Sequence, residues 1–145
     1  MLLKMTLLSF LGSVFPVILF NIDRKKIFWC GLAGGIGWIG YSLTLDNTNS
    51  MVLASFIGAV VVNIYSEIMA RIIHTPASMF YIPGIFPLVP GILAYSTIVH
   101  IVEKDFSQAI SSGLATLSVG ISISIGIMLS STLIKFIFKV YKLKR

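Results

Sequence analysis

The sequence predicts an all-α, polytopic transmembrane protein, and three observations carry this prediction. Hydrophobic residues make up 57% of the 145 positions and charged residues only 11%, against about a quarter charged in a typical soluble domain. Five apolar segments each approach the roughly 20 residues that a spanning helix needs. The connectors between them are short and polar, so we expect one integral membrane domain over 1–145 and no separate soluble domain.

The expected spans are, in order, 3–20, 27–45, 51–70, 79–102 and 108–134. The first segment is followed by "NIDRKK" and not by a small-x-small cleavage site, which favours a retained span over a secretory signal. It is short once Lys4 is excluded, so a count of four spans is the alternative.

Small residues recur at helical spacing in two of these segments. The second span, "CGLAGGIGWIGYS", pairs Gly31 with Gly35 and Ala33 with Gly37. Such small-xxx-small pairs let helices approach closely in lipid. The last span carries a similar stripe, made of Gly113, Thr116, Gly120, Ser124 and Ser131. Internal packing, a face for another subunit and the lining of a substrate path all remain open for these stripes.

The basic residues follow the positive-inside pattern. If the first connector is cytoplasmic, five spans leave only Lys4 and Lys104 outside. We therefore expect a multi-pass protein of the cell inner membrane with its N-terminus outside and its C-terminus cytoplasmic. The net charge of +6 resides in these clusters between spans, so we do not expect nucleic-acid binding. The cytoplasmic set is Arg24, Lys25, Lys26, Arg71, Lys135, Lys139, Lys142, Lys144 and Arg145.

Glu67 is the acidic residue that falls inside an expected span. Asn63, Glu67 and Arg71 are spaced four residues apart and so share one helical face. A carboxylate at membrane depth is costly unless it is paired, neutralised or hydrated, which makes Glu67 a functional candidate. Two interpretations stay open: a structural ion pair with Arg71, or a proton-exchanging group in a wet cavity.

Few side chains are suited to catalysis. The single cysteine, Cys30, lies in an apolar run, where a small packed side chain is the simpler interpretation. The acidic residues do not show metal-ligand spacing, and the two histidines are expected on opposite sides of the membrane. We therefore expect no enzyme, no metal site and no cofactor.

Residues 75–96, "TPASMFYIPGIFPLVPGILAYS", are apolar but rich in helix breakers. Each proline removes a backbone donor and frees a carbonyl one turn earlier, so Pro83, Pro87 and Pro90 predict a broken helix at 82–91 that resumes near Ile92. Such backbone is tolerated at membrane depth where protein buries it or where it lines a wet cavity, as in transporters. A kinked helix or a long cytoplasmic connector is the alternative.

The stretch "YIPGIFPLVPG", preceded by "ARIIHTPAS" and followed by "LAYS", resembles the signature of the threonine/serine exporter family. The resemblance covers almost the whole chain and is to the small membrane subunit of the split form, which is equivalent to the C-terminal membrane portion of single-chain exporters. It implies proton-driven export of small polar metabolites, either hydroxylated amino acids or small dicarboxylates, together with a larger membrane subunit.

These arguments combine into one hypothesis for the site. The broken element binds the substrate at depth, Glu67 and Arg71 are the proton-coupling candidates, and Tyr81 and Tyr95 close the site. A non-transporting assembly subunit and a passive, channel-like pore are the alternative functions. The expected substrate-binding residues are Pro83, Gly84, Pro87, Pro90, Gly91 and Asn63.

Overall fold

The computed structural model describes residues 2–143, within which the regular structure is entirely helical. Lys144 and Arg145, counted above among the cytoplasmic charges, lie outside the described residues, as does the side chain of Lys142. The elements in chain order are α1 (Leu2–Leu19), η1 (Arg24–Lys26), α2 (Ile27–Thr48), α3 (Met51–Ile73), α4 (Ser78–Ile85), η2 (Phe86–Leu88), α5 (Gly91–Val102) and α6 (Phe106–Leu143).

Four of these segments are long and apolar enough to cross a membrane, namely α1, η1 with α2, α3, and α6. The pair formed by α4–η2 and α5 passes the same criterion as one segment, but it is bent by 52°. The all-α class and the count of four to five spans are thus confirmed. The helix α6 is longer than expected: its 38 residues extend about 57 Å, against roughly 30 Å of hydrocarbon in a bilayer.

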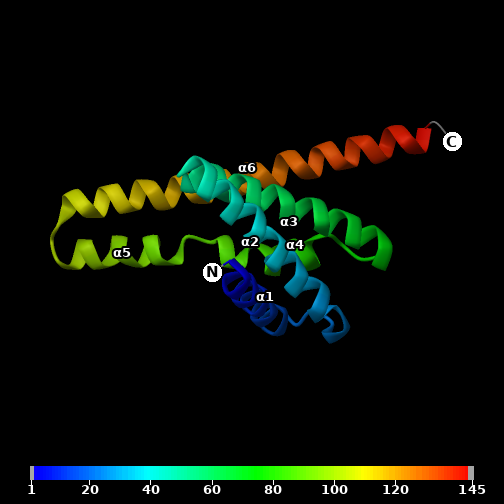
Figure 1. The fold of residues 1–145 in the computed structure, drawn as a ribbon, viewed down its shortest axis with the longest axis horizontal. Helices are drawn as coiled ribbons and strands as arrows, with labels where there is room; N and C mark the ends of the chain where they lie inside the picture. Colours follow the sequence, from blue (N-terminus) through cyan, green and yellow to red (C-terminus); the bar gives the residue numbers. More distant parts are fainter. Residues whose placement is uncertain (1, 144–145) are drawn as a thin grey trace.

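The helices form a bundle from which one hairpin projects. Consecutive helices α1, α2 and α3 pack against each other, α4 packs on α2 and α3, and α6 packs on α3. Figure 1 shows α5 and the first part of α6 extending together beyond the ends of α1 to α3, with the other end of α6 projecting on the opposite side. Since α5 has no buried residue, much of this apolar hairpin is left uncovered by the rest of the chain.

Small residues bring the bundle helices close together, as their spacing predicted. A Cβ atom on Gly31 would lie 2.7 Å from the ring of Phe10 on α1, and one on Gly37 would collide with Val62 on α3. Ala33 is fully buried in the core cluster that also contains Val62. Both small-xxx-small pairs of α2 therefore contribute to packing within this chain.

The chain between α3 and α5 is broken over a shorter stretch than predicted. Helix α4 continues through Pro83 and Gly84 to Ile85, and within the predicted break at 82–91 the irregular backbone is confined to Val89 and Pro90. The helix then resumes at Gly91, as the proline spacing predicted.

The reason α4 survives its internal proline lies on α2. Pro83 cannot donate to the carbonyl of Met79 one turn earlier. That carbonyl instead accepts a hydrogen bond from Cys30 Sγ at 3.2 Å. Cys30 is fully buried as expected, but it also satisfies a backbone group that the proline frees.

The two later prolines are accommodated by tightening the backbone. The carbonyl of Pro83, one turn before Pro87, accepts from the Phe86 N–H. The carbonyl of Phe86, one turn before Pro90, accepts from the Val89 N–H at 3.3 Å. These three-residue spacings are those of a 3₁₀ helix, which explains why η2 replaces α-helix just before the break.

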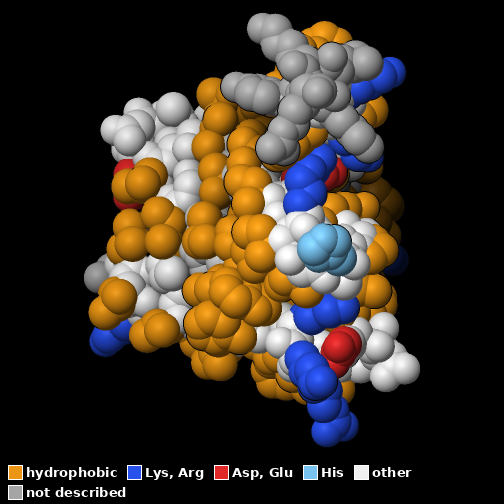
Figure 2. Space-filling model, turned by 90° about the vertical axis from the view of Figure 1, so that its right-hand side faces the viewer, with side chains coloured by type: hydrophobic (Ala, Val, Ile, Leu, Met, Phe, Trp, Pro, Cys, Tyr) orange, Lys and Arg blue, Asp and Glu red, His pale blue; other side chains and the backbone are white. Residues whose placement is uncertain are grey.

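Many of the basic side chains lie at the end of the molecule that faces the viewer in Figure 2. Arg71 and Lys135 line one cavity there, and Lys26 Nζ lies 3.6 Å from Met79 Sδ at the start of α4. This grouping fits the positive-inside pattern. The assignment of this end to the cytoplasm stays a prediction.

Candidate functional site

The interruption between η2 and α5 opens onto a cavity of about 410 Å³, which we call the break cavity. Five elements besides the interruption itself contribute lining residues, namely α2, α3, η2, α5 and α6. Its lining residues are Trp38, Tyr41, Met51, Ser55, Pro87, Leu88, Val89, Pro90, Gly91, Ile92, Leu93 and Val119.

The backbone at the break presents unused donors to this cavity. Pro90 (φ −76°, ψ 59°) is the centre of an inverse γ-turn, in which the Gly91 N–H donates to the Val89 carbonyl at 2.8 Å. The N–H groups of Ile92 and Leu93 then begin α5 without an acceptor among residues 2–143. The first turn of a helix also carries a partial positive charge, so these amides favour a negatively charged group.

One lining side chain of the break cavity, Trp38, carries a buried donor. Trp38 Nε1 is buried and has no hydrogen-bond partner within the part of the chain that the structure describes. The ring of Trp38 stacks on Tyr41 with the centroids 5.1 Å apart. A buried indole N–H normally has an acceptor, but Nε1 is enclosed by its neighbours and is not open to a ligand in the cavity.

The predicted substrate-binding residues divide between cavity and core. Pro87, Pro90 and Gly91 line the break cavity. Pro83 and Gly84 are buried in α4 and do not line the break cavity. A Cβ atom on Gly84 would lie 2.8 Å from Val62 Cγ1 and 2.9 Å from Ala33 Cβ, so its small size serves helix packing.

Asn63 joins two helices and is not at the break. Its side chain is fully buried, and Nδ2 donates to Ser130 Oγ at 2.8 Å and to Ser131 Oγ at 3.0 Å. These bonds connect α3 to α6 in the apolar interior. Asn63 therefore connects two helices in this structure. Its position on the same helical face as Glu67 did not indicate this contact.

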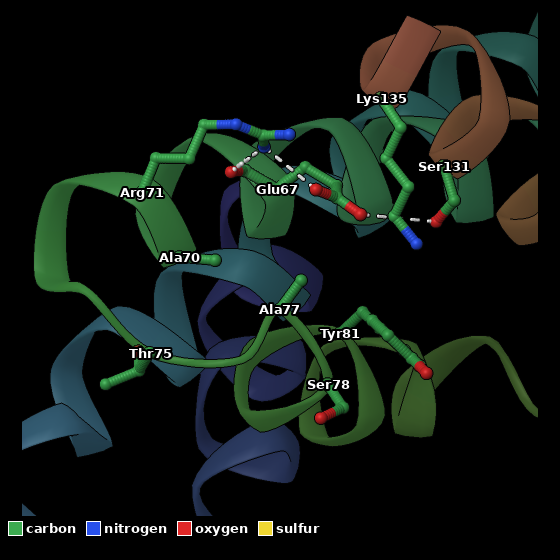
Figure 3. Close-up of a pocket in the computed structure, with 9 residues that line it drawn as sticks. All are labelled: Glu67, Ala70, Arg71, Thr75, Ala77, Ser78, Tyr81, Ser131 and Lys135. Carbon is green, nitrogen blue, oxygen red and sulfur yellow. Dashed lines mark hydrogen bonds and ion pairs between the residues drawn. The ribbon is translucent and has the colours of Figure 1, made fainter. Parts of the chain in front are cut away.

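Glu67 and Arg71 lie at a second cavity, of about 470 Å³, which we call the Glu67 cavity (Figure 3). Glu67 Oε2 is 2.8 Å from Arg71 Nη1, and Ser131 Oγ lies 3.5 Å from Glu67 Oε1. The guanidinium of Arg71 also lies 4.0 Å from the ring centroid of Phe138. The remaining lining residues are Ala70, Thr75, Ala77, Ser78, Tyr81 and Lys135.

The two cavities are separate. On α3, Ser55 belongs to the break cavity and Glu67 to the other. The same separation recurs on α6 between Val119 and Ser131, and it corresponds to about 18 Å along each helix. The structure therefore does not bring Glu67 to the broken element, and Tyr81 lies with Glu67 and not at the break.

The sequence did not predict two polar residues of the Glu67 cavity, Thr75 and Lys135, as site residues. Lys135 was counted only as a topology charge, and Thr75 fell in a connector. The hydroxyl of Thr75 is nevertheless buried and lacks a hydrogen-bond partner among the described residues. Their spacing from Glu67 in sequence carries no signal, because α6 folds back on α3 only in the tertiary structure.

This fold and site define a class of protein: a multi-pass helical membrane protein with a broken span, after which helix α5 begins with backbone N–H groups that have no acceptor among the described residues, as at the broken helices of secondary transporters. Residues 5–133 match the family described as "Threonine/Serine exporter, ThrE". The chain belongs to this exporter family, which confirms the resemblance of its proline-rich stretch.

One curated relative and the absence of a structural match complete the comparison. The chain is 24% identical over 107 residues to an uncharacterized protein of Haemophilus influenzae, a match that covers 68% of this chain and 36% of that protein. The match thus spans about a third of that relative's length. No solved structure matches the chain.

Proposed function

We propose that this chain is a membrane subunit of a secondary exporter in the inner membrane. It moves small polar metabolites, threonine/serine-type amino acids or small dicarboxylates, out of the cytoplasm and acts with a larger partner subunit. The observation that supports this proposal best is the break cavity, where Ile92 and Leu93 line the wall and their N–H groups have no acceptor among the described residues.

These donors suit a carboxylate, which both substrate types carry. A carboxylate oxygen can accept from the two amides at the start of α5, and hydrogen bonds to an ionised acceptor are roughly twice as strong as neutral ones. The partial positive charge of the helix N-terminus adds to this attraction. The apolar side chains of Leu88, Leu93 and Val119 in the wall lower the local dielectric and so strengthen each of these interactions.

In this proposal Glu67 is the residue that couples export to the proton gradient. Its carboxylate is 7% exposed and held by Arg71. Protonation removes the charge that pairs with Arg71, so the ion pair opens and the contact between α3 and α6 through Ser131 changes. Glu67→Gln then uncouples export from the proton gradient, whereas a passive pore would carry the same flux with the gradient collapsed.

The partner subunit covers the α5–α6 hairpin. Ile92 is 84% exposed and Val102 is 74% exposed, so the hairpin offers apolar surface over its whole length. Figure 1 shows this hairpin beyond the ends of α1 to α3. The same surface would serve a pure assembly subunit, which is the second candidate function.

A size series at Gly91 tests the proposal. Gly91 lines the break cavity and a Cβ atom there meets no other atom within 4 Å, so alanine fits without a clash, whereas a longer side chain takes up space beside the free amides of Ile92 and Leu93. Overpacking a binding site by about 1–3 kcal/mol weakens binding about tenfold or more. We expect Gly91→Leu to reduce export by that factor at equal membrane abundance and Gly91→Ala to retain most of it. Full export by Gly91→Leu would instead favour the assembly subunit.

A further inference from the structure

The Glu67 cavity holds a positive charge for which the described side chains offer no partner. Glu67 pairs with Arg71, but Lys135 Nζ makes no ion pair or hydrogen bond within the described part of the chain. Figure 3 shows the Lys135 side chain reaching from α6 into the space between Glu67 and Tyr81. Three charged groups, two positive and one negative, thus leave this cavity with one excess positive charge.

The neutral groups around Lys135 are also suited to a polar ligand. Ser78 and Tyr81 from α4 and Ser131 from α6 bring hydroxyl groups to the wall. These three hydroxyl groups can donate to or accept from a polar ligand that lies beside Lys135.

From this arrangement we infer that the Glu67 cavity is a second binding site, at the basic end of the molecule, in which Lys135 binds the carboxylate of a small ligand. The inference rests on the proposed export function, and it makes this cavity the place where the substrate is loaded. About 18 Å of helix separates it from the break cavity.

The charges also select the ligand class. One carboxylate neutralises Lys135, and an ammonium or hydroxyl group on the same ligand can then donate to Glu67. A second carboxylate would approach the Glu67 carboxylate, and like charges at about 4 Å repel. The site therefore prefers a ligand with one carboxylate and a nearby donor over a dicarboxylate.

The test compares two lysines on the same helix. Lys135 lines the cavity, whereas Lys139, one turn later, does not. Both are exposed basic residues, so replacing either by glutamine changes the net charge equally and leaves the core intact. The full chain carrying Lys135→Gln, Lys135→Arg or Lys139→Gln is placed in nanodiscs of zwitterionic lipid and titrated calorimetrically with L-threonine, L-threoninol and succinate.

We expect Lys135→Gln to weaken threonine binding about tenfold or more, because a hydrogen bond to a charged group is lost. Lys139→Gln leaves binding unchanged, Lys135→Arg restores most of it, and threoninol and succinate bind more weakly than threonine. Equal affinity for the two glutamine variants, or no threonine binding by the unaltered chain, overturns the inference. So does loss of binding when the nanodiscs contain anionic lipid, because a headgroup phosphate would then be the partner of Lys135.

Export by Gly91→Leu, compared with the titration of the lysine variants, separates the two proposals. Loss of export by Gly91→Leu together with equal binding by Lys135→Gln and Lys139→Gln would refute the loading site and support the proposed role of the break cavity. Normal export by Gly91→Leu together with weak binding by Lys135→Gln would do the reverse.

Discussion

Asn63 provides the sharpest test of how the structure assigns roles, because the sequence placed it among the substrate-binding residues. In the structure its amide nitrogen donates to Ser130 Oγ at 2.8 Å and Ser131 Oγ at 3.0 Å, with the side chain fully buried between α3 and α6. Replacement by alanine removes both bonds and leaves a small void in the interior.

The magnitude follows from these contacts. Interhelical hydrogen bonds in membrane proteins contribute about 0.6 kcal/mol each on average and at most about 1.7 kcal/mol. Two such bonds and the lost packing give an expected destabilisation of about 2 kcal/mol for Asn63→Ala. The measurement is equilibrium unfolding in mixed micelles with increasing sodium dodecyl sulfate. The control is Asn47→Ala, because Asn47 bonds only to its own helix, at the Leu43 carbonyl.

A double-mutant cycle with Ser131→Ala isolates the bond across the helices, for which we expect a coupling energy of about 0.6 kcal/mol. A cost for Asn63→Ala equal to that of Asn47→Ala would contradict the structural assignment. Loss of export by Asn63→Ala at unchanged stability would also contradict this assignment and would indicate that Asn63 binds the substrate.

Two further predictions concern the bundle. Cys30→Ala removes the donor to the Met79 carbonyl, and a buried carbonyl without a partner costs about 1–3 kcal/mol. We therefore expect Cys30→Ala to unfold at a lower detergent concentration and Cys30→Ser to restore most of the lost stability. Equal stability of the two variants would refute the role of this bond. Gly34→Ala places a methyl group against Ser13 of α1 and should cost about 1–3 kcal/mol of unfolding free energy. Adding Ser13→Gly should recover much of that cost, since the Ser13 hydroxyl has no partner among the described residues; no recovery would locate the strain elsewhere.

Local composition was sufficient to predict the helices and their approximate bounds. Apolar runs of about 20 residues have few alternatives to a helix in lipid, because each backbone group must be satisfied within its own segment. The resumption of helix at Gly91 followed from proline geometry for the same reason. The length of the break did not: α4 stays helical through Pro83 because Cys30, 49 residues away in sequence, satisfies the freed carbonyl.

For this protein, the sequence alone determined what depends on covalent geometry and hydropathy: the helical class, the number of candidate spans, the small-residue contacts of α2 and the family. Tertiary structure alone decided which polar groups meet. In the folded chain Asn63 bonds to Ser130, Lys135 and Glu67 line the same cavity, and Glu67 lies away from the broken element. The physical reason is that spacing along one helix fixes which residues share a face, whereas the neighbour of that face depends on how helices distant in sequence pack.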